Sequence, residues 1–250
     1  MTRDSNKSST VLRSFRVLEA VANSPAPMTA RGVAESIGLD RITCYRMLKT
    51  IEEAGYLNFD TVSKTFSLSQ RVLMLARNAM AQDADREQID RILRAISAAT
   101  GETCHYSEMD GPQTILTQRA KGTQLVVVDF QIGARCELHA SSVGKAILAS
   151  QDDSFIENYL DGELKRYTTN TFCEPERLRG EILKIRREGV AYDFEELSIG
   201  MNCVAVPFRG FSGEVRSGIS ISGPDSRFTA ARLVELAAVI KDEIGKMKMV

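Results

Sequence analysis

A run of basic and hydrogen-bonding residues between positions 41 and 49 carries the clearest chemistry in this sequence. The candidate contact residues in it are Arg41, Ile42, Thr43, Tyr45, Arg46 and Lys49. A guanidinium group can form two parallel hydrogen bonds to a guanine edge or to a phosphate. Arg41 and Arg46 are therefore the best candidates for such contacts, while Thr43 and Tyr45 can hydrogen-bond to bases or backbone. The run predicts a surface that contacts duplex DNA.

The elements around this run favour that interpretation over an ordinary solvated helix face, which two arginines and a lysine would equally produce. Thr29 is a candidate N-cap of one short helix, and Gly38 stands where a helix end needs positive φ. Asp40 can cap a second helix, whose buried stripe would hold Cys44, Leu48 and Ile51. Two helices joined by a glycine turn predict a helix-turn-helix.

Two alternating segments follow the second helix. Residues 55–60 and 65–68 alternate like paired strands, with Thr-Val-Ser-Lys between them. A hairpin in this place is typical of a wing, and Lys64 at its tip could reach a phosphate. An additional helix over residues 9–23 should complete the core, with an inward stripe at four-three-four spacing. That stripe is Val11, Phe15, Leu18 and Ala22.

Length and composition indicate a globular protein with room for two domains. The chain has 250 residues, of which 43% are hydrophobic and 26% charged. No apolar run approaches the ~18–20 residues of a membrane span, and the polar N-terminus lacks an apolar signal core, so a cytoplasmic protein without membrane contact is expected. The five cysteines include no C-x-x-C, which argues against a disulfide framework or a zinc finger.

Charge is distributed unevenly along the chain. Residues 1–80 carry 11 Lys and Arg against 7 Asp and Glu, whereas residues 81–250 carry 21 against 26. A basic module followed by an acidic one fits a part that faces phosphate and a part that avoids it. Residues 1–8 should form a flexible arm, in which Arg3 and Lys7 are further candidates for DNA contact.

The remainder of the chain predicts a mixed α+β domain. An apolar period interrupted by a polar stretch near 82–88 indicates a linker helix followed by a domain boundary. Strands are expected over 103–109, 114–119 and 125–130, and later over 189–193, 203–207 and 215–222. Helices are expected over 141–150, 152–161, 175–188 and from Thr229 onward. This order predicts an antiparallel sheet flanked by helices.

Several motifs together resemble the IclR-type bacterial transcription regulators. The segment from Leu39 to Tyr56 is similar to the recognition segment of that family. Further motifs follow in the family's order: Thr100-Gly-Glu-Thr103, Leu138-His-Ala-Ser-Ser-Val-Gly-Lys-Ala146, Arg187-Glu-Gly-Val-Ala-Tyr-Asp193, Glu195-Glu196 and Ser220-Ile-Ser-Gly-Pro224. The resemblance covers about residues 9–248, and the ordered set is far more specific than any single motif.

The resemblance implies a particular organisation. After the flexible arm at 1–8, it implies a winged helix-turn-helix at 9–69, a linker helix at 70–88 and a GAF-like effector-binding domain at 89–250. It also implies homodimers, often paired into homotetramers. Ile42 departs from the family, which commonly has serine there. An apolar side chain could touch a thymine methyl, so the operator sequence cannot be transferred from relatives.

A second candidate site lies where a loop enters the helix at 141. Free backbone N–H groups at a helix N-terminus favour an anion, and Ser141 and Ser142 add hydroxyl donors. A nucleotide-binding P-loop is rejected, because its first glycine and the Ser or Thr after Lys145 are absent. By resemblance, the pocket is also lined by Val127, Arg135, Asp193, Cys203, Ser220 and Ser222. Arg135 would complement a carboxylate, which favours a small organic acid.

These observations predict an effector-controlled DNA-binding regulator of a catabolic operon, more often a repressor than an activator, with no cofactor, metal or catalytic residue. Three alternatives remain open. Cys136 and His139 could form the thiol–imidazole pair of a hydrolase with an accessory DNA-binding module, or Cys203, Asp193 and His139 could hold a metal. The C-terminal half could also serve oligomerisation alone, which would make the chain an architectural DNA-binding protein.

Overall fold

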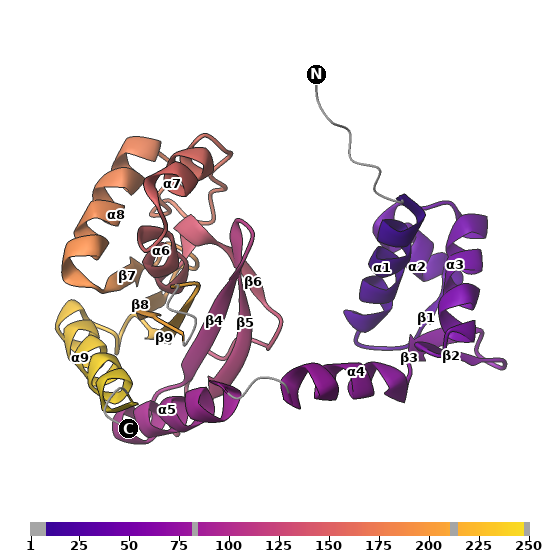
Figure 1. Cartoon of the computed structure of the whole chain (residues 1–250), viewed down its shortest axis with the longest axis horizontal. Helices are drawn as coiled ribbons and strands as arrows, with labels where there is room; N and C mark the ends of the chain where they lie inside the picture. Colours follow the sequence, from indigo (N-terminus) through magenta and orange to yellow (C-terminus); the bar gives the residue numbers. More distant parts are fainter. Residues whose placement is uncertain (1–8, 82–84, 211–214, 248–250) are drawn as a thin grey trace. The chain divides into compact units, whose positions relative to one another are not determined.

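The computed structural model describes residues 9–81, 85–210 and 215–247. The chain divides into two compact units, Met1–Asp83 and Ala84–Val250, which Figure 1 draws in indigo to purple and in magenta to yellow. The expected arm at 1–8, with Arg3 and Lys7, lies outside the described residues. Among the helices of the described ranges, none is long and apolar enough to cross a membrane.

The N-terminal unit packs three helices against a small antiparallel sheet. The helices are α1 (Ser9–Ala22), α2 (Ala30–Ile37) and α3 (Arg41–Glu53), and the strands are β1 (Met28–Thr29), β2 (Leu57–Asp60) and β3 (Thr65–Leu68). β3 lies between β1 and β2. The core includes Val17, Val33, Cys44, Leu48 and Phe66, none of which is exposed to solvent.

Local signals fix the turn between α2 and α3. The Thr29 hydroxyl accepts a hydrogen bond from the Gly32 N–H at 3.2 Å, and Asp40 Oδ1 accepts one from the Thr43 N–H at 2.9 Å. Gly38 ends α2 with φ of 66°, which glycine adopts without steric cost. The helix-turn-helix therefore arises from the caps and the glycine that the sequence indicated.

The expected inward face of α1 is wrong. Val11 and Phe15 are 52% and 58% exposed, while Val17 and Val21 are buried. The helix has apolar residues on more than one side, so spacing alone does not determine which side packs. Contact with α2 and α3 buries the Val17 side.

The segment after the wing forms two helices, α4 (Gln70–Ala81) and α5 (Asp85–Thr100), with residues 82–84 outside the described residues. Ser69 caps the start of α4, because its hydroxyl accepts a hydrogen bond from the Arg71 N–H at 3.2 Å. The proposed linker at 70–88 therefore spans α4 and the first turn of α5.

The C-terminal unit is built on an antiparallel sheet in which the described strands run in the order β6-β5-β4-β9-β8-β7. Their bounds are β4 (Cys104–Asp110), β5 (Gln113–Ala120), β6 (Arg135–Glu137), β7 (Ala191–Phe194), β8 (Met201–Phe208) and β9 (Ser217–Pro224). The helices after α5 are η1 (Leu138–Ala140), α6 (Ser142–Ala149), α7 (Asp153–Leu160), α8 (Pro175–Glu188) and α9 (Ala230–Met247). The predicted two-domain α+β class is confirmed.

The central strands give the sheet two chemically different faces. Cys104, Tyr106, Ile219 and Ile221 join the apolar core beneath α5 and α9. The alternate positions face α6, and the side chains there include those of His105, Ser107, Ser220, Ser222 and Cys203. The helices α6, α7 and α8 and an apolar cluster of their own lie on that second side (Figure 1).

The strand expected at 125–130 is absent from the described structure. Leu125 is fully exposed and Val126 is 60% exposed, so this apolar run does not enter the core. The segment is a loop, and Arg119 holds it by donating to the Phe130 carbonyl at 2.7 Å and pairing with Asp129. The edge position beside β5 is taken instead by β6.

Candidate functional sites

The outer face of α3 presents the expected DNA-contacting side chains to solvent. Arg41 and Arg46 are exposed, as are Ile42 at 75% and Tyr45 at 45%. Among the described residues, no hydrogen bond or ion pair engages either guanidinium group. Because α3 buries Cys44 on its opposite side, the helix is anchored while its basic face stays available.

This face forms one wall of a hollow of about 870 Å³ between α3, the start of α2 and the hairpin. Its lining residues are Thr29, Ala30, Arg31, Arg41, Ile42, Tyr45, Arg46, Phe59, Lys64 and Phe66. Lys64 lies in the hairpin turn with φ of 56°, and Tyr45 packs edge-on against Phe66 with ring centroids 6.5 Å apart. Five of the expected residues therefore share one concave surface.

Two expected residues lie elsewhere, and one was missed. Thr43 is absent from the lining of the hollow. Lys49 pairs with Glu52 and lies 5.0 Å from the Phe59 ring centroid, so its charge is partly committed within the fold. Arg31, which was not among the expected contact residues, lines the hollow and pairs with Glu35 at 2.7 Å. Arg31 could have been predicted as a contact residue, because it is a basic residue in the first turn of α2.

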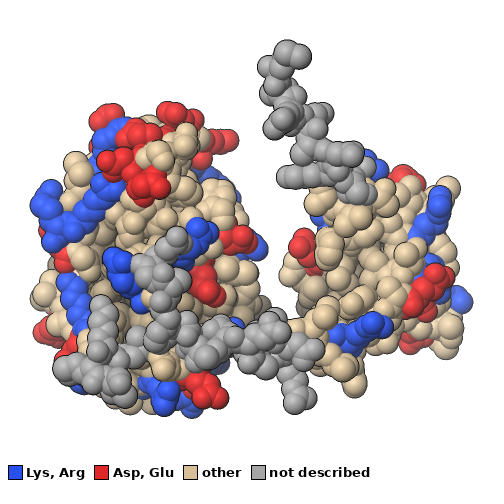
Figure 2. All heavy atoms as spheres, in the orientation of Figure 1, with Lys and Arg blue, Asp and Glu red and all other residues tan. Residues whose placement is uncertain are grey.

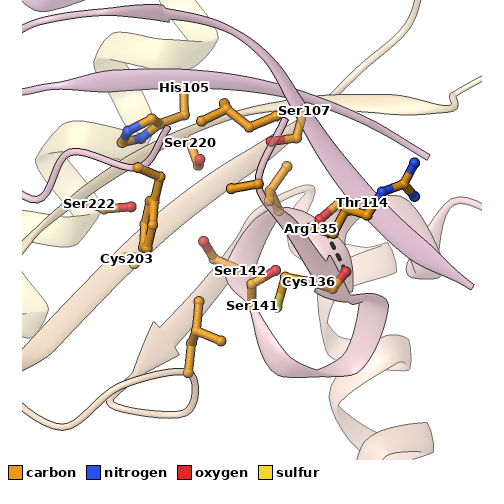
Figure 3. A pocket seen from close by; sticks show the side chains of 15 residues that line it. His105, Ser107, Thr114, Arg135, Cys136, Ser141, Ser142, Cys203, Ser220 and Ser222 are labelled. Atoms are coloured by element: carbon orange, nitrogen blue, oxygen red, sulfur yellow. Dashed lines mark hydrogen bonds between the residues drawn. The ribbon is translucent and has the colours of Figure 1, made fainter. Parts of the chain in front are cut away.

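The second site is a cavity of about 220 Å³ in the C-terminal unit (Figure 3). It lies between the α6 side of the sheet and the start of α6. Its lining residues are His105, Ser107, Thr114, Leu116, Phe130, Ala134, Arg135, Cys136, Ser141, Ser142, Val143, Leu197, Cys203, Ser220 and Ser222. The cavity combines serine hydroxyls with an apolar wall, as small-molecule sites do.

The start of α6 supplies hydrogen-bond donors to this cavity. Ser141 caps the helix, and its hydroxyl accepts from the Gly144 N–H at 3.1 Å. The N–H groups of Ser142 and Val143 stand in the first turn, where a helix offers no acceptor of its own. An anion placed there would gain both N–H groups and the favourable end of the helix dipole.

Arg135 lies among the lining residues, but its charge is already compensated. Its guanidinium pairs with Asp110 at 2.5 Å, and its side chain is 47% exposed. A ligand carboxylate would therefore compete with Asp110 and with water for this arginine. The buried donors at the start of α6 are better placed to bind an anion.

Two residues expected in the pocket do not line it. Val127 belongs to the loop over 121–134. Asp193 lies opposite Cys203 in the β7–β8 register, is not exposed, and accepts a hydrogen bond from the Glu196 N–H at 2.7 Å. Burial raises the pKa of Asp193 to about 6, although the Lys145 ammonium opposes this shift. Asp193 thus lies beside Cys203 and is not among the residues that line the cavity.

The structure argues against the thiol–imidazole alternative. His139 is buried with its Nδ1 2.7 Å from the Tyr159 hydroxyl and its Nε2 2.9 Å from the Lys165 carbonyl, so neither nitrogen is free to act as a base. Burial raises the pKa of Cys136 to about 12, which keeps the thiol protonated. In the described part of the chain, no group of His, Cys, Asp and Glu side chains could hold a metal ion.

A winged helix-turn-helix whose basic recognition face is exposed is typical of a DNA-binding transcription regulator. Comparison with protein-family models supports this class. The model for the IclR helix-turn-helix domain matches residues 10–61, and the model for the bacterial transcriptional regulator IclR C-terminal domain matches residues 80–247. The chain belongs to the IclR family of transcription regulators, as the motifs indicated.

Individual relatives agree with this assignment. The chain is 27% identical to the transcriptional repressor IclR of Escherichia coli over 231 residues, which cover 91% of this chain and 84% of the relative. The crystal structure of Thermotoga maritima IclR has a TM-score of 0.74 and 28% identity, covering 94% and 96% of the two chains. An IclR homologue from Microbacterium hydrocarbonoxydans shares the fold, with a TM-score of 0.79 and 22% identity over 95% and 100% of the chains. The matched domains and relatives are regulators and not enzymes.

Proposed function

We propose that this regulator represses a catabolic operon and releases its operator when a small organic acid occupies the cavity beside α6. The observation that carries the proposal is that cavity, because its wall combines the first-turn N–H groups of α6 with serine hydroxyls from β4 and β9. Such a wall suits a carboxylate at one end and an apolar body behind it.

Size and relatives support the same ligand class. A cavity of ~150 Å³ lined by apolar side chains holds benzene, so about 220 Å³ leaves room for a ring with polar substituents. The Microbacterium hydrocarbonoxydans relative was crystallised as a complex with 4-hydroxybenzoate. We therefore favour a ring-sized or shorter monocarboxylic acid as the effector of this chain.

For DNA, we propose that α3 enters the major groove of the operator. Arg41 and Arg46 would read base edges or clamp phosphates, Ile42 would touch a thymine methyl, and Lys64 would contact a phosphate from the wing. Repression is the direction suggested by the E. coli relative, which is named as a repressor. Homodimers or homotetramers would present two such helices to an operator of repeated half-sites.

The test begins by selecting operator duplexes from a random DNA library with the full-length protein. Fluorescence anisotropy then measures operator affinity while benzoate, hydroxybenzoates and short aliphatic acids are titrated separately. An acid that weakens operator binding in the wild type, but not in Ser142→Phe, where the new ring fills the cavity, supports the proposal. Unchanged operator affinity with every acid would leave an architectural DNA-binding protein as the better description.

A further inference from the structure

His105 is a buried polar side chain in the cavity wall that the proposed function does not use. It lies on β4 and is only 2% exposed, yet neither of its ring nitrogens has a hydrogen-bond partner among the described residues. The other histidine of the chain, His139, has a partner for each nitrogen. Leaving a buried polar group without partners costs free energy, so the unmet nitrogens of a side chain that lines a cavity indicate where a polar ligand atom would fit.

The protonation state of His105 determines which polar group of a ligand can hydrogen-bond to it. Burial lowers the pKa of His105 to about 4, so at neutral pH the imidazole is uncharged. A neutral imidazole offers one N–H donor and one bare nitrogen acceptor. A hydroxyl group can satisfy either, because it also both donates and accepts, whereas a carboxylate only accepts and an ammonium only donates.

The position of His105 relative to α6 determines the distance between that hydroxyl and a carboxylate held at the start of α6. Gly218 lies under Val143 at the start of α6, where an added Cβ would come within 2.9 Å of Val143 Cγ2. Ser220, two residues or ~7 Å further along β9, is the register partner of His105. Figure 3 accordingly places His105 and Ser220 on one side of the cavity and Ser141 and Ser142 on the other.

An aromatic ring forms part of the wall beside His105. The Phe130 ring also lines the cavity, and its centroid lies 5.6 Å from that of the His105 ring. A six-membered ring with a substituent at each end would span from α6 to His105 and pack against Phe130.

We propose that His105 recognises a hydroxyl group at the end of the effector opposite its carboxylate, so that this regulator distinguishes hydroxylated acids from their unhydroxylated counterparts. This inference rests on the proposed function, because it takes the carboxylate to be held at the start of α6. His105 is then the residue that determines specificity within the same site.

Isothermal titration calorimetry of the full-length protein with benzoate and the three monohydroxybenzoates tests this inference. We expect the wild type to bind at least one hydroxybenzoate roughly tenfold or more tightly than benzoate, because a site built for a hydroxyl rejects the ligand that lacks it. His105→Phe keeps the ring but removes both hydrogen bonds, so it should lose this preference while still binding benzoate. His105→Gln retains a donor and an acceptor and should keep part of the preference.

Two controls separate recognition from folding. Without ligand, His105→Phe should unfold at the same temperature as the wild type or a higher one, because it removes an unsatisfied buried group. The chain has 2 histidines, so nitrogen NMR of the wild-type rings adds a measurement that needs no variant. The hydroxybenzoate should shift the ring nitrogens of His105 and leave those of His139 unchanged.

Each outcome has a definite meaning. If His105→Phe keeps the wild-type preference, or the hydroxybenzoate leaves the His105 nitrogens unshifted, the inference is overturned and the proposed function stands. The same holds if the wild type binds benzoate and the hydroxybenzoates equally. If none of these acids binds to the wild type, the proposed ring-sized effector fails, and this inference fails with it.

Discussion

The two arginines of α3 are the residues on which operator recognition should depend most directly. Arg41 and Arg46 are exposed, and in the described structure neither guanidinium group is committed to an internal partner. Their removal should therefore cost binding and leave the fold intact. A side chain that reads a base discriminates between DNA sequences, whereas one that neutralises a phosphate strengthens binding to every sequence.

Arg46→Ala should weaken operator binding by ~1–3 kcal/mol if the guanidinium reads a base. Fluorescence anisotropy at fixed salt measures the change. Arg94→Ala is the matched control, because Arg94 is an exposed arginine on α5 that pairs with Asp90 in the other unit. Equal affinities for Arg46→Ala and Arg94→Ala would remove Arg46 from the interface.

The buried carboxyl of Asp193 should make stability depend on pH. Its pKa of about 6 lies above the ordinary value of 3.8, so the folded state binds this proton more tightly than the unfolded state. The stabilisation from that proton is complete below about pH 4 and is lost as the pH rises through about 6. Asp193→Asn keeps the acceptor for the Glu196 N–H but never carries the charge.

The free energy of unfolding of Asp193→Asn relative to the wild type should therefore rise between pH 4 and pH 6 and level off above that range. Chemical denaturation at several pH values measures this difference. Parallel curves for the two proteins would show that Asp193 titrates alike in the folded and unfolded states, contrary to the burial argument.

Two glycines have opposite effects on the helices that contain or end at them, α2 and α8. Gly38 closes α2 with φ of 66° and has open space around an added Cβ, so Gly38→Ala should cost about 1–2 kcal/mol through backbone strain alone. Gly180 lies inside α8, also in open space but without positive φ, so Gly180→Ala should stabilise by ~0.5–1 kcal/mol. Thermal unfolding of the two variants should give opposite signs, and shifts of the same sign would refute the role given to Gly38.

The elements that local chemistry specifies were predictable from the sequence. Thr29, Gly38 and Asp40 specify the turn between α2 and α3, and the inward face of α9 followed from helical spacing at Leu233, Leu236, Ala237 and Ile240. The face of α1 and the loop over 125–130 were predicted wrongly. In both cases the apolar pattern was compatible with more than one arrangement. Contacts between residues distant in sequence determine which face of α1 is buried and whether residues 125–130 form a strand.

The residues that line the pocket likewise divide into those that the sequence predicted and those that it did not. Ser141 and Ser142 could be found from the helix start, whereas Arg135, Cys203, Ser220 and Ser222 came from resemblance to the family. His105 and Ser107 were missed because only strand pairing brings them to the cavity, and Phe130 was missed because it reaches the cavity from a loop. One signal was available: His105 and Ser107 are polar residues at alternate positions of a strand, like Ser220 and Ser222.

At the scale of the whole molecule, control of the operator by an acid requires energetic coupling between the two units. In our proposal, operator binding belongs to the basic N-terminal unit and acid binding to the more acidic C-terminal unit; Figure 2 colours the charged side chains on one face of each. The acid can weaken operator binding only if its affinity differs between operator-bound and operator-free protein. By linkage, the operator must then weaken acid binding by the same factor.

The most direct test is to measure this factor in both directions on the full-length protein. Operator affinity is determined with and without saturating acid, and acid affinity with and without saturating operator. Our account predicts equal factors within the ~5–150-fold range typical of coupled sites, and a factor near one for Ser142→Phe. An acid that binds tightly while operator affinity stays the same would contradict the claim that this cavity controls DNA binding.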